Sequence, residues 1–223
     1  MNLLKRIPIH YKGELHDVRL VNFSVDINEL KDRIPSTIKI RNFNGRAMIS
    51  MVDVRLRKMR PVFFPLFKFN YRHIAFRVLV DDSEYNAGTS KGIFFYRSFT
   101  DNLLIVSGGR MLTDYNLESA HIEENESTVT ISKGNNFVKY CFDNSSVEGD
   151  DKLLTAIGSL DRAYSMLGDS IRVTIIQREK WPIKPVSCSR FENTFFKTAR
   201  LEGMFRVFET IYYDWLPPTK VTS

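Results

Sequence analysis

The chain has 223 residues, of which 43% are hydrophobic and 13% aromatic, enough to bury one sizeable core. It has no apolar run near the roughly 20 residues that span a bilayer and no long apolar stretch typical of a signal peptide, so we expect one cytoplasmic domain, residues 1–223, without a membrane partner. The net charge of +6 comes from basic residues spread along the chain, whereas nucleic-acid binding requires clustered cations, so nucleic acid is not an expected partner.

The first part of the chain is predicted to form a strand, a short helix and a hairpin. Residues 18–25 alternate apolar and polar side chains, the period of a strand with one buried face. Asp26 with Glu29 three residues later is a variant of the capping box, and it predicts a short helix that ends at Pro35. Residues 37–41 and 46–57 then predict a hairpin about Asn44 and Gly45, which tolerate positive φ.

Residues 61–69 are too rich in proline for a central strand and too aromatic for an ordinary loop. We interpret them as a loop that closes over the core. A lid over a pocket and a subunit interface are the alternatives, because large exposed apolar patches usually have a partner, and a homo-oligomer therefore stays open. Residues 71–80 and 92–99 follow as two strands joined by a polar turn.

Asp101 is the expected N-cap of a helix that delivers Arg110 and Tyr115. The pair Gly108 and Gly109 indicates close packing rather than a phosphate cradle, since no phosphate-binding glycine motif surrounds it. The remaining expectations are a meander of strands at 119–124, 127–132 and 137–142, an exposed loop at 143–151, a partly helical stretch at 153–167, and strands at 170–177 and 204–215.

Several motifs, in this order and spacing, resemble one family. They are Val25–Leu30 with Pro35, Asn44–Ala47, Phe69–Arg72, Gly92–Phe95 with Asp101, Gly108–Ala120, and Lys180–Ile183. This pattern is similar to an uncharacterised conserved bacterial branch of the acetoacetate decarboxylase-like superfamily, although Lys68 stands where a Glu is usual. The resemblance runs from residue 18 to 183, and the last forty residues match less well. It implies an α+β, mainly β fold: an antiparallel cone or barrel that encloses a pocket, with a few peripheral helices.

This chain has no lysine at the two positions that match the catalytic lysines of that superfamily. Counted without gaps from Gly109 and Arg110, the Schiff-base lysine and the lysine that depresses its pKa fall on Leu117 and Glu118. A leucine cannot form an imine, and a carboxylate raises the pKa of a neighbouring amine. His16 and Ser50 also stand where the decarboxylases carry an arginine and a glutamate. Acetoacetate decarboxylation is therefore not expected.

The candidate ligand site consists of Arg72, Arg110, Tyr115, Glu118 and Leu117. Two guanidiniums, a phenol and a carboxylate can hold an anionic or polar molecule within an apolar pocket. Alternation along the strand places residues 72 and 73 on opposite faces, and the family pattern favours Arg72 for the pocket. The structural alternative is that buried arginines and glutamates in the barrel satisfy one another.

Other reactive side chains have simpler interpretations. Lys68, between two phenylalanines, is a weak candidate for a catalytic amine, because such lysines more often extend to water. His73 is expected at the surface or hydrogen-bonded within its strand, Cys141 in the core, and Trp181 packed at a strand end. Two cysteines without metal-ligand spacing and four scattered histidines predict neither a disulfide framework nor a metal site, and no cofactor is indicated.

The leading hypothesis is a protein that binds a small anionic or partly apolar molecule in the barrel. The first alternative is an enzyme of unknown reaction, lyase-like or hydrolase-like, that uses Arg, Tyr and Glu side chains of the pocket. The second is a structural or interaction protein whose barrel is filled by side chains. The first two hypotheses require a cavity beside the arginines, whereas the third predicts that there is none.

Overall fold

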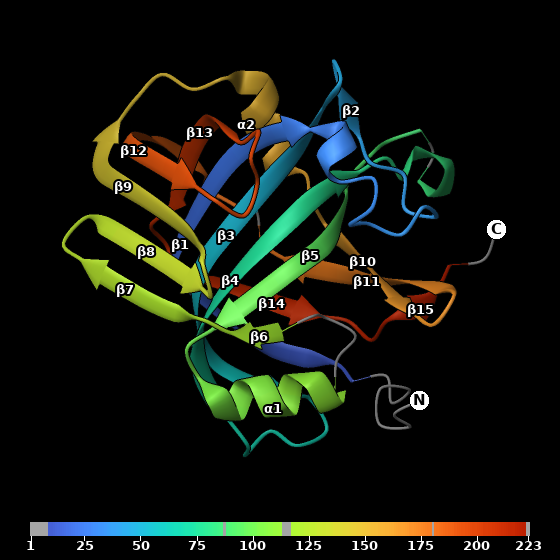
Figure 1. The fold of residues 1–223 in the computed structure, drawn as a ribbon. Coiled ribbons are helices and arrows are strands. Elements are labelled where there is room, and N and C mark those ends of the chain that lie inside the picture. The colour runs from blue at the N-terminus through green and yellow to red at the C-terminus, as the bar shows by residue number, and fades with distance from the viewer. Residues whose placement is uncertain (1–8, 87, 113–116, 180, 222–223) are drawn as a thin grey trace.

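Seven strands close a barrel in the computed structural model, which describes residues 9–86, 88–112, 117–179 and 181–221 (Figure 1). In order around the barrel they are β3 (Arg46–Pro61), β4 (Phe69–Val80), β5 (Gly92–Thr100), β10 (Arg162–Leu167), β11 (Ser170–Arg178), β14 (Ile211–Trp215) and β1 (Tyr11–Asp26). Pairing of β1 with β3 closes the ring. The predicted mainly β barrel is confirmed, and neighbouring strands of the closed ring are antiparallel except for β10, which runs parallel to β5.

A second set of strands extends from the barrel through β1. The N-terminal half of β1 pairs with β14, and residues Val18–Ser24 pair with β13 (Arg200–Val207). The sheet continues through β12 (Lys184–Asn193), β9 (Asn136–Ser146), β8 (Thr128–Lys133) and β7 (His121–Asn125). The predicted meander corresponds to β7, β8 and β9, and β9 runs on into the expected 143–151 loop. Strand β12 was not expected from the sequence.

Two helices lie at opposite ends of the barrel strands in Figure 1: α1 (Leu103–Leu112) and α2 (Asp151–Gly158). The predicted cap Asp101 is wrong: Asn102 caps α1, because its Oδ1 accepts the backbone N–H groups of residues 104 and 105 at 3.1 and 3.2 Å. Asp150 caps α2. The expected helical stretch 153–167 ends at Gly158, and its second half is strand β10.

The predicted hairpin is only partly present. The turn forms as expected, with positive φ at Asn44 and Gly45, but its first strand is β2 (Asn42–Phe43), two residues long. Residues 37–41 are not a strand; Ile40 alone bridges Val80. The short helix before them is a single 3-10 turn, Ile27–Glu29, capped by Asp26. Two further short strands are β6 (Leu117–Ser119), beside β5, and β15 (Thr219–Lys220), beside β11.

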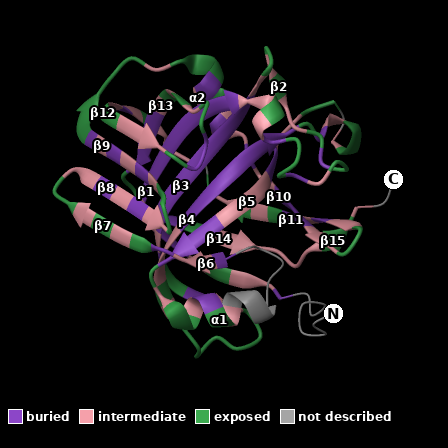
Figure 2. Ribbon diagram, in the orientation of Figure 1, coloured by how far each residue is buried: buried purple, intermediate pink, exposed green. Residues whose placement is uncertain are grey.

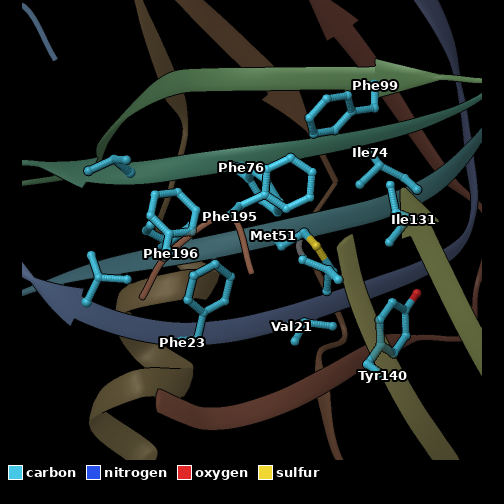
Figure 3. Packing of buried hydrophobic residues seen from close by; sticks show 14 of the residues in the cluster. Val21, Phe23, Met51, Ile74, Phe76, Phe99, Ile131, Tyr140, Phe195 and Phe196 are labelled. Atoms are coloured by element: carbon cyan, nitrogen blue, oxygen red, sulfur yellow. The ribbon is translucent and has the colours of Figure 1, made fainter. Parts of the chain in front are cut away.

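Alternation along the barrel strands produces two apolar cores on opposite faces of the sheet. Outside the barrel, Phe23, Met51, Ile74 and Phe76 pack with Tyr140 of β9 (Figure 3). Inside it, the alternate residues of the same strands form a second cluster that includes Leu15, Leu20, Val52, Ala75 and Leu79. Figure 2 shows the resulting band of buried residues along β1, β3 and β4. Each fully buried Phe or Leu contributes about 1.5–3 kcal/mol relative to leaving it exposed.

Candidate functional site

A cavity of about 540 Å³ occupies the interior of the barrel. Every barrel strand except β10 contributes lining residues, and these alternate along the chain, as the pleat of a strand requires. The lining from the strands is mostly aliphatic and aromatic, with Val52, Val54 and Leu56 from β3, Phe69, Tyr71 and His73 from β4, Ile93 and Phe95 from β5, and Tyr213 and Trp215 from β14. A concave, mainly apolar site with a few polar groups is the usual form of a small-molecule site.

Arg77 of β4 brings a positive charge into this cavity. Its Nε donates to the backbone O of Ser50 at 3.1 Å, and its Nη2 donates to the Ser50 Oγ at 2.8 Å. Both acceptors are neutral. Burial, with a further contribution from the charge of Arg178, lowers the pKa of Arg77 to about 9. The guanidinium remains protonated at neutral pH, but burial makes its charged form less stable than it would be in water.

Arg178, at the end of β11, is the second cation of the cavity lining. Its Nη2 donates to the backbone O atoms of Gly158 and Leu160, at and just beyond the C-terminus of α2, and the guanidinium lies 4.5 Å from the ring centroid of Trp181. Burial lowers the pKa of Arg178 to about 10, although Asp161 acts in the opposite direction. Among the described residues, no carboxylate oxygen lies within 4 Å of Arg77 or Arg178.

His73 lies on the same face of β4 as Arg77. Burial, with a further contribution from the charge of Arg77, lowers the pKa of His73 to about 4, so the imidazole is neutral at pH 7. Its Nδ1 has no hydrogen-bond partner among the described residues, and neither has the indole Nε1 of Trp181. The cavity therefore presents two unneutralised cations and two unpaired polar atoms within aromatic walls.

A family model described as "Uncharacterized conserved protein", DUF2071, matches residues 12–213. The chain belongs to the DUF2071 family. No curated protein matches its sequence significantly. Solved structures similar to the DUF2071 barrel include acetoacetate decarboxylase from Legionella pneumophila subsp. pneumophila str. Philadelphia 1, with 12% identity, a TM-score of 0.64, and coverage of 95% of this chain and 87% of the decarboxylase.

A second similar structure is the enduracididine biosynthesis enzyme MppR, in complex with the condensation product of pyruvate and imidazole 4-carboxaldehyde. It shares 11% identity with the DUF2071 chain at a TM-score of 0.60, over 97% of this chain and 90% of MppR. Identities this low establish a shared fold. The acetoacetate decarboxylase-like fold, predicted from the sequence, is thereby confirmed.

The described residues of the predicted site lie in different places in the barrel. Leu117 of β6 lines the cavity. Glu118, the next residue, accepts from Nε and Nη2 of Arg97 at 2.8 Å each. Arg110 falls within α1, but its side chain and the whole of Tyr115 lie outside the described residues.

Arg72 lies on the outer face of the sheet, within a cluster of charged side chains. Its guanidinium donates to both carboxylate oxygens of Asp53, at 2.8 and 2.6 Å, and to Glu124 at 2.7 Å. Arg19 and the Tyr140 hydroxyl also contact Asp53. This arrangement matches the structural alternative weighed for Arg72, mutual satisfaction of buried charges, and the cluster holds β7 and β9 against the barrel.

Three other expectations can be compared with the structure. His73 was expected at the surface or bonded within its strand, and it lines the cavity because it shares the inward face with Tyr71 and Arg77. Cys141 was expected in the core; it is half-buried, with its Sγ 3.5 Å from the Ser127 hydroxyl. Trp181 packs against the inner core as expected, and it also lines the cavity.

The aromatic loop 61–69 lies at the α1 end of the barrel. Its side chains are unusually exposed for their size, with 71% of Phe63 and 89% of Leu66 open to solvent. Lys68 is exposed, whereas Phe67 lines the cavity, so the loop closes part of the mouth rather than burying itself in the core. Ring contacts then lead inward from the loop, linking Phe64, Phe67, Phe69, Tyr71, His73 and Phe95 with successive centroid distances between 5.8 and 6.4 Å.

Neither Arg77 nor Arg178 was among the site residues predicted from the sequence. The period of two along β4 carries a signal for Arg77, since residues 71, 73, 75 and 77 must share one face once the strand is placed. Arg178 carries no comparable signal, because it follows the predicted end of its strand. None of the described helices is long and apolar enough to span a membrane. The described residues also contain no group of three or more His, Cys, Asp or Glu side chains that could hold a metal ion.

Proposed function

We propose that the barrel cavity binds a small molecule that has one anionic group and an apolar body. The observation that carries this proposal is the pair Arg77 and Arg178, which lie inside an aromatic cavity without a carboxylate partner among the described residues. A buried charge is ordinarily paired, because desolvation is costly. A bound anion supplies that partner through charge-assisted hydrogen bonds, and the apolar walls take the rest of the molecule.

The similar structures support the same class of ligand. Acetoacetate and pyruvate, from which the names of the decarboxylase and of the MppR complex derive, are both oxo acids that carry a carboxylate. The chemistry is not carried over with the fold. Imine formation needs a lysine amine, and the described lining of the cavity contains no lysine, with Leu117 in the segment that resembles the decarboxylase active site.

Titration with octanoate and with the neutral isostere octanamide tests the proposal. We expect octanoate to bind saturably and octanamide to bind at least about tenfold more weakly, because hydrogen bonds to charged groups contribute about 1.5–3 kcal/mol. Arg77→Met is expected to remove this preference. Arg57→Met is the matched control, since Arg57 is exposed on β3 and does not line the cavity.

Two results contradict the proposal. One is equal affinity for the acid and the amide. The other is an Arg77→Met variant that has a wild-type melting temperature and still binds octanoate as the wild type does. Arg77→Lys separates charge from geometry: a retained preference for the acid at reduced affinity indicates that the fork of the guanidinium also contributes.

A further inference from the structure

We infer that the ligand is an extended single-chain amphiphile, a long-chain monocarboxylate, with its head at the α2 end of the barrel and its tail directed to the mouth beside α1. This rests on the proposed function and adds the shape, class and orientation of the ligand. Arg77 and Arg178 mark the head end. The tail end is marked by Phe67 and Phe69.

The cavity is long, because it reaches from one end of the barrel to the other. Its lining includes Ile157 of α2 and Leu104 and Gly108 of α1, and these helices lie at opposite ends of the barrel strands (Figure 1). Along β4, the lining residues Phe69 and Arg77 are eight positions apart, which corresponds to roughly 26 Å of strand.

Away from its head, the cavity is lined mostly by apolar side chains, with Asn70, Asn102 and His73 as polar members of the lining. A cavity of about 540 Å³ that extends over this length has room for one extended hydrocarbon chain. The row of ring contacts from Phe95 through His73 and Tyr71 to Phe69 forms one continuous wall along it. Aromatic side chains such as these offer a large apolar surface to methylene groups.

Exposed apolar side chains surround the mouth of the cavity, and they favour a hydrocarbon tail rather than a charged head at that end. The ring contacts continue from Phe69 through Phe67 to Phe64, which is 53% exposed, and Leu104 of α1 beside the same opening is 84% exposed. A hydrocarbon tail that reaches this rim covers apolar surface that otherwise faces water. A short anion would occupy only the head end, and the apolar side chains at the rim would stay exposed to water.

Gly108 permits a direct test of the tail path. It lines the outer part of the cavity, and a Cβ built on it meets no described atom within 4 Å, so a larger side chain enters open space. Leucine is also a better helix former than glycine, which keeps α1 intact. Ser107→Leu is the matched control, because Ser107 is exposed on the same helix and does not line the cavity.

The experiment is calorimetric titration of hexanoate, decanoate, tetradecanoate and octadecanoate into wild type, Gly108→Leu and Ser107→Leu. In the wild type we expect affinity to rise by up to about fourfold per added methylene until the tail reaches the rim. Gly108→Leu is expected to bind hexanoate like the wild type and the two longest acids at least about tenfold more weakly. Ser107→Leu is expected to follow the wild type throughout.

The inference is overturned if affinity is greatest for hexanoate and falls along the series, or if a folded Gly108→Leu variant binds every acid as the wild type does. In both cases a retained preference of octanoate over octanamide, abolished in Arg77→Met, leaves the proposed function standing. Failure of every acid to bind, short and long, instead contradicts the proposed function itself.

Discussion

Arg72 of β4 and Asp53 of β3 form a two-point ion pair, with both carboxylate oxygens held by one guanidinium at 2.8 and 2.6 Å. Both side chains are buried, 9% and 3% exposed, and the pair is extended by Glu124 of β7. The pair lies on the opposite face of β4 from the cavity. It therefore provides a way to disturb stability without touching the proposed ligand site.

Arg72→Ala is expected to lower the free energy of unfolding by about 3–5 kcal/mol, because it leaves Asp53 buried with weaker compensation. Urea titration followed by circular dichroism measures this effect. Arg57→Ala, the control on β3, is expected to change stability by less than about 0.5 kcal/mol because its side chain is exposed and has no ion pair among the described residues. Equal stability of the two variants would contradict a structural role for Arg72.

His73 is expected to make the protein sensitive to mild acid. Its pKa is about 4 in the folded protein against an ordinary value of 6.5, so the unfolded chain binds a proton first as the pH falls. The contribution of His73 to stability is thus fully present above pH 6.5 and is lost progressively as the pH falls toward 4, by up to about 3 kcal/mol.

Urea midpoints of wild type and His73→Phe, measured from neutral pH to about pH 4, test this expectation. Other groups titrate in the same range, so the relevant quantity is the difference between the two curves. We expect that difference to change in favour of His73→Phe as the pH falls. A difference that stays constant with pH would show that His73 titrates alike in the folded and unfolded chains.

Two glycines are expected to respond oppositely to the same substitution. A Cβ on Gly92 would lie 2.5 Å from Cε2 of Tyr164 and 2.7 Å from Cγ2 of Val80, so Gly92→Ala is expected to cost about 1–3 kcal/mol through overpacking. Gly108→Ala meets no described atom and is expected to stabilise the protein by about 0.5–1 kcal/mol. Melting temperatures of the two variants test the contrast, and a shift in the same direction would contradict it.

Ligand binding is expected to be visible in intrinsic fluorescence. The chain contains two tryptophans, Trp181 and Trp215, and both line the cavity. A ligand that displaces water from their surroundings is expected to shift the emission to shorter wavelength, with the same concentration dependence as calorimetry. Trp215→Phe leaves Trp181, which lies beside Arg178 at the head end, and Trp181→Phe leaves Trp215 in the cavity wall. Emission that does not change when calorimetry shows saturation would place the ligand outside this cavity.

The sequence identified the fold better than the site. The strand at residues 18–25, the turn at Asn44 and Gly45 and the meander after residue 119 have local signals, and the structure contains all three. The expected single buried face at 18–25 is wrong, because residues 18–25 are buried on both faces of the sheet. Strand β12 was not predicted, and residues 162–167 fell within the stretch 153–167 that was predicted to be partly helical. β12 pairs with the distant β9, and β10 pairs with the distant β5 as well as with its neighbour β11. Such strands gain their stability from neighbours that propensity alone does not reveal.

The choice between Arg72 and His73 shows a similar limit. They are neighbours on one predicted strand, and alternation separates their faces correctly, but His73 rather than Arg72 lines the cavity. Which face lines a cavity depends on the closure of β1 onto β3, a contact between distant segments. Arg178 depends further on the position of α2, whose last carbonyls its guanidinium contacts.

The two faces of β4 carry residues with different roles: one face lines the cavity, and the other stabilises the sheet. Positions 71, 73 and 77 line the cavity, whereas positions 72, 74 and 76 pack or pair with residues on the outer face of the sheet. Substitutions on the inward face can therefore exchange one recognition chemistry for another at little expense to folding. Because the two roles lie on opposite faces of one strand, proteins with this fold can differ in the molecules that they recognise while they keep the same barrel.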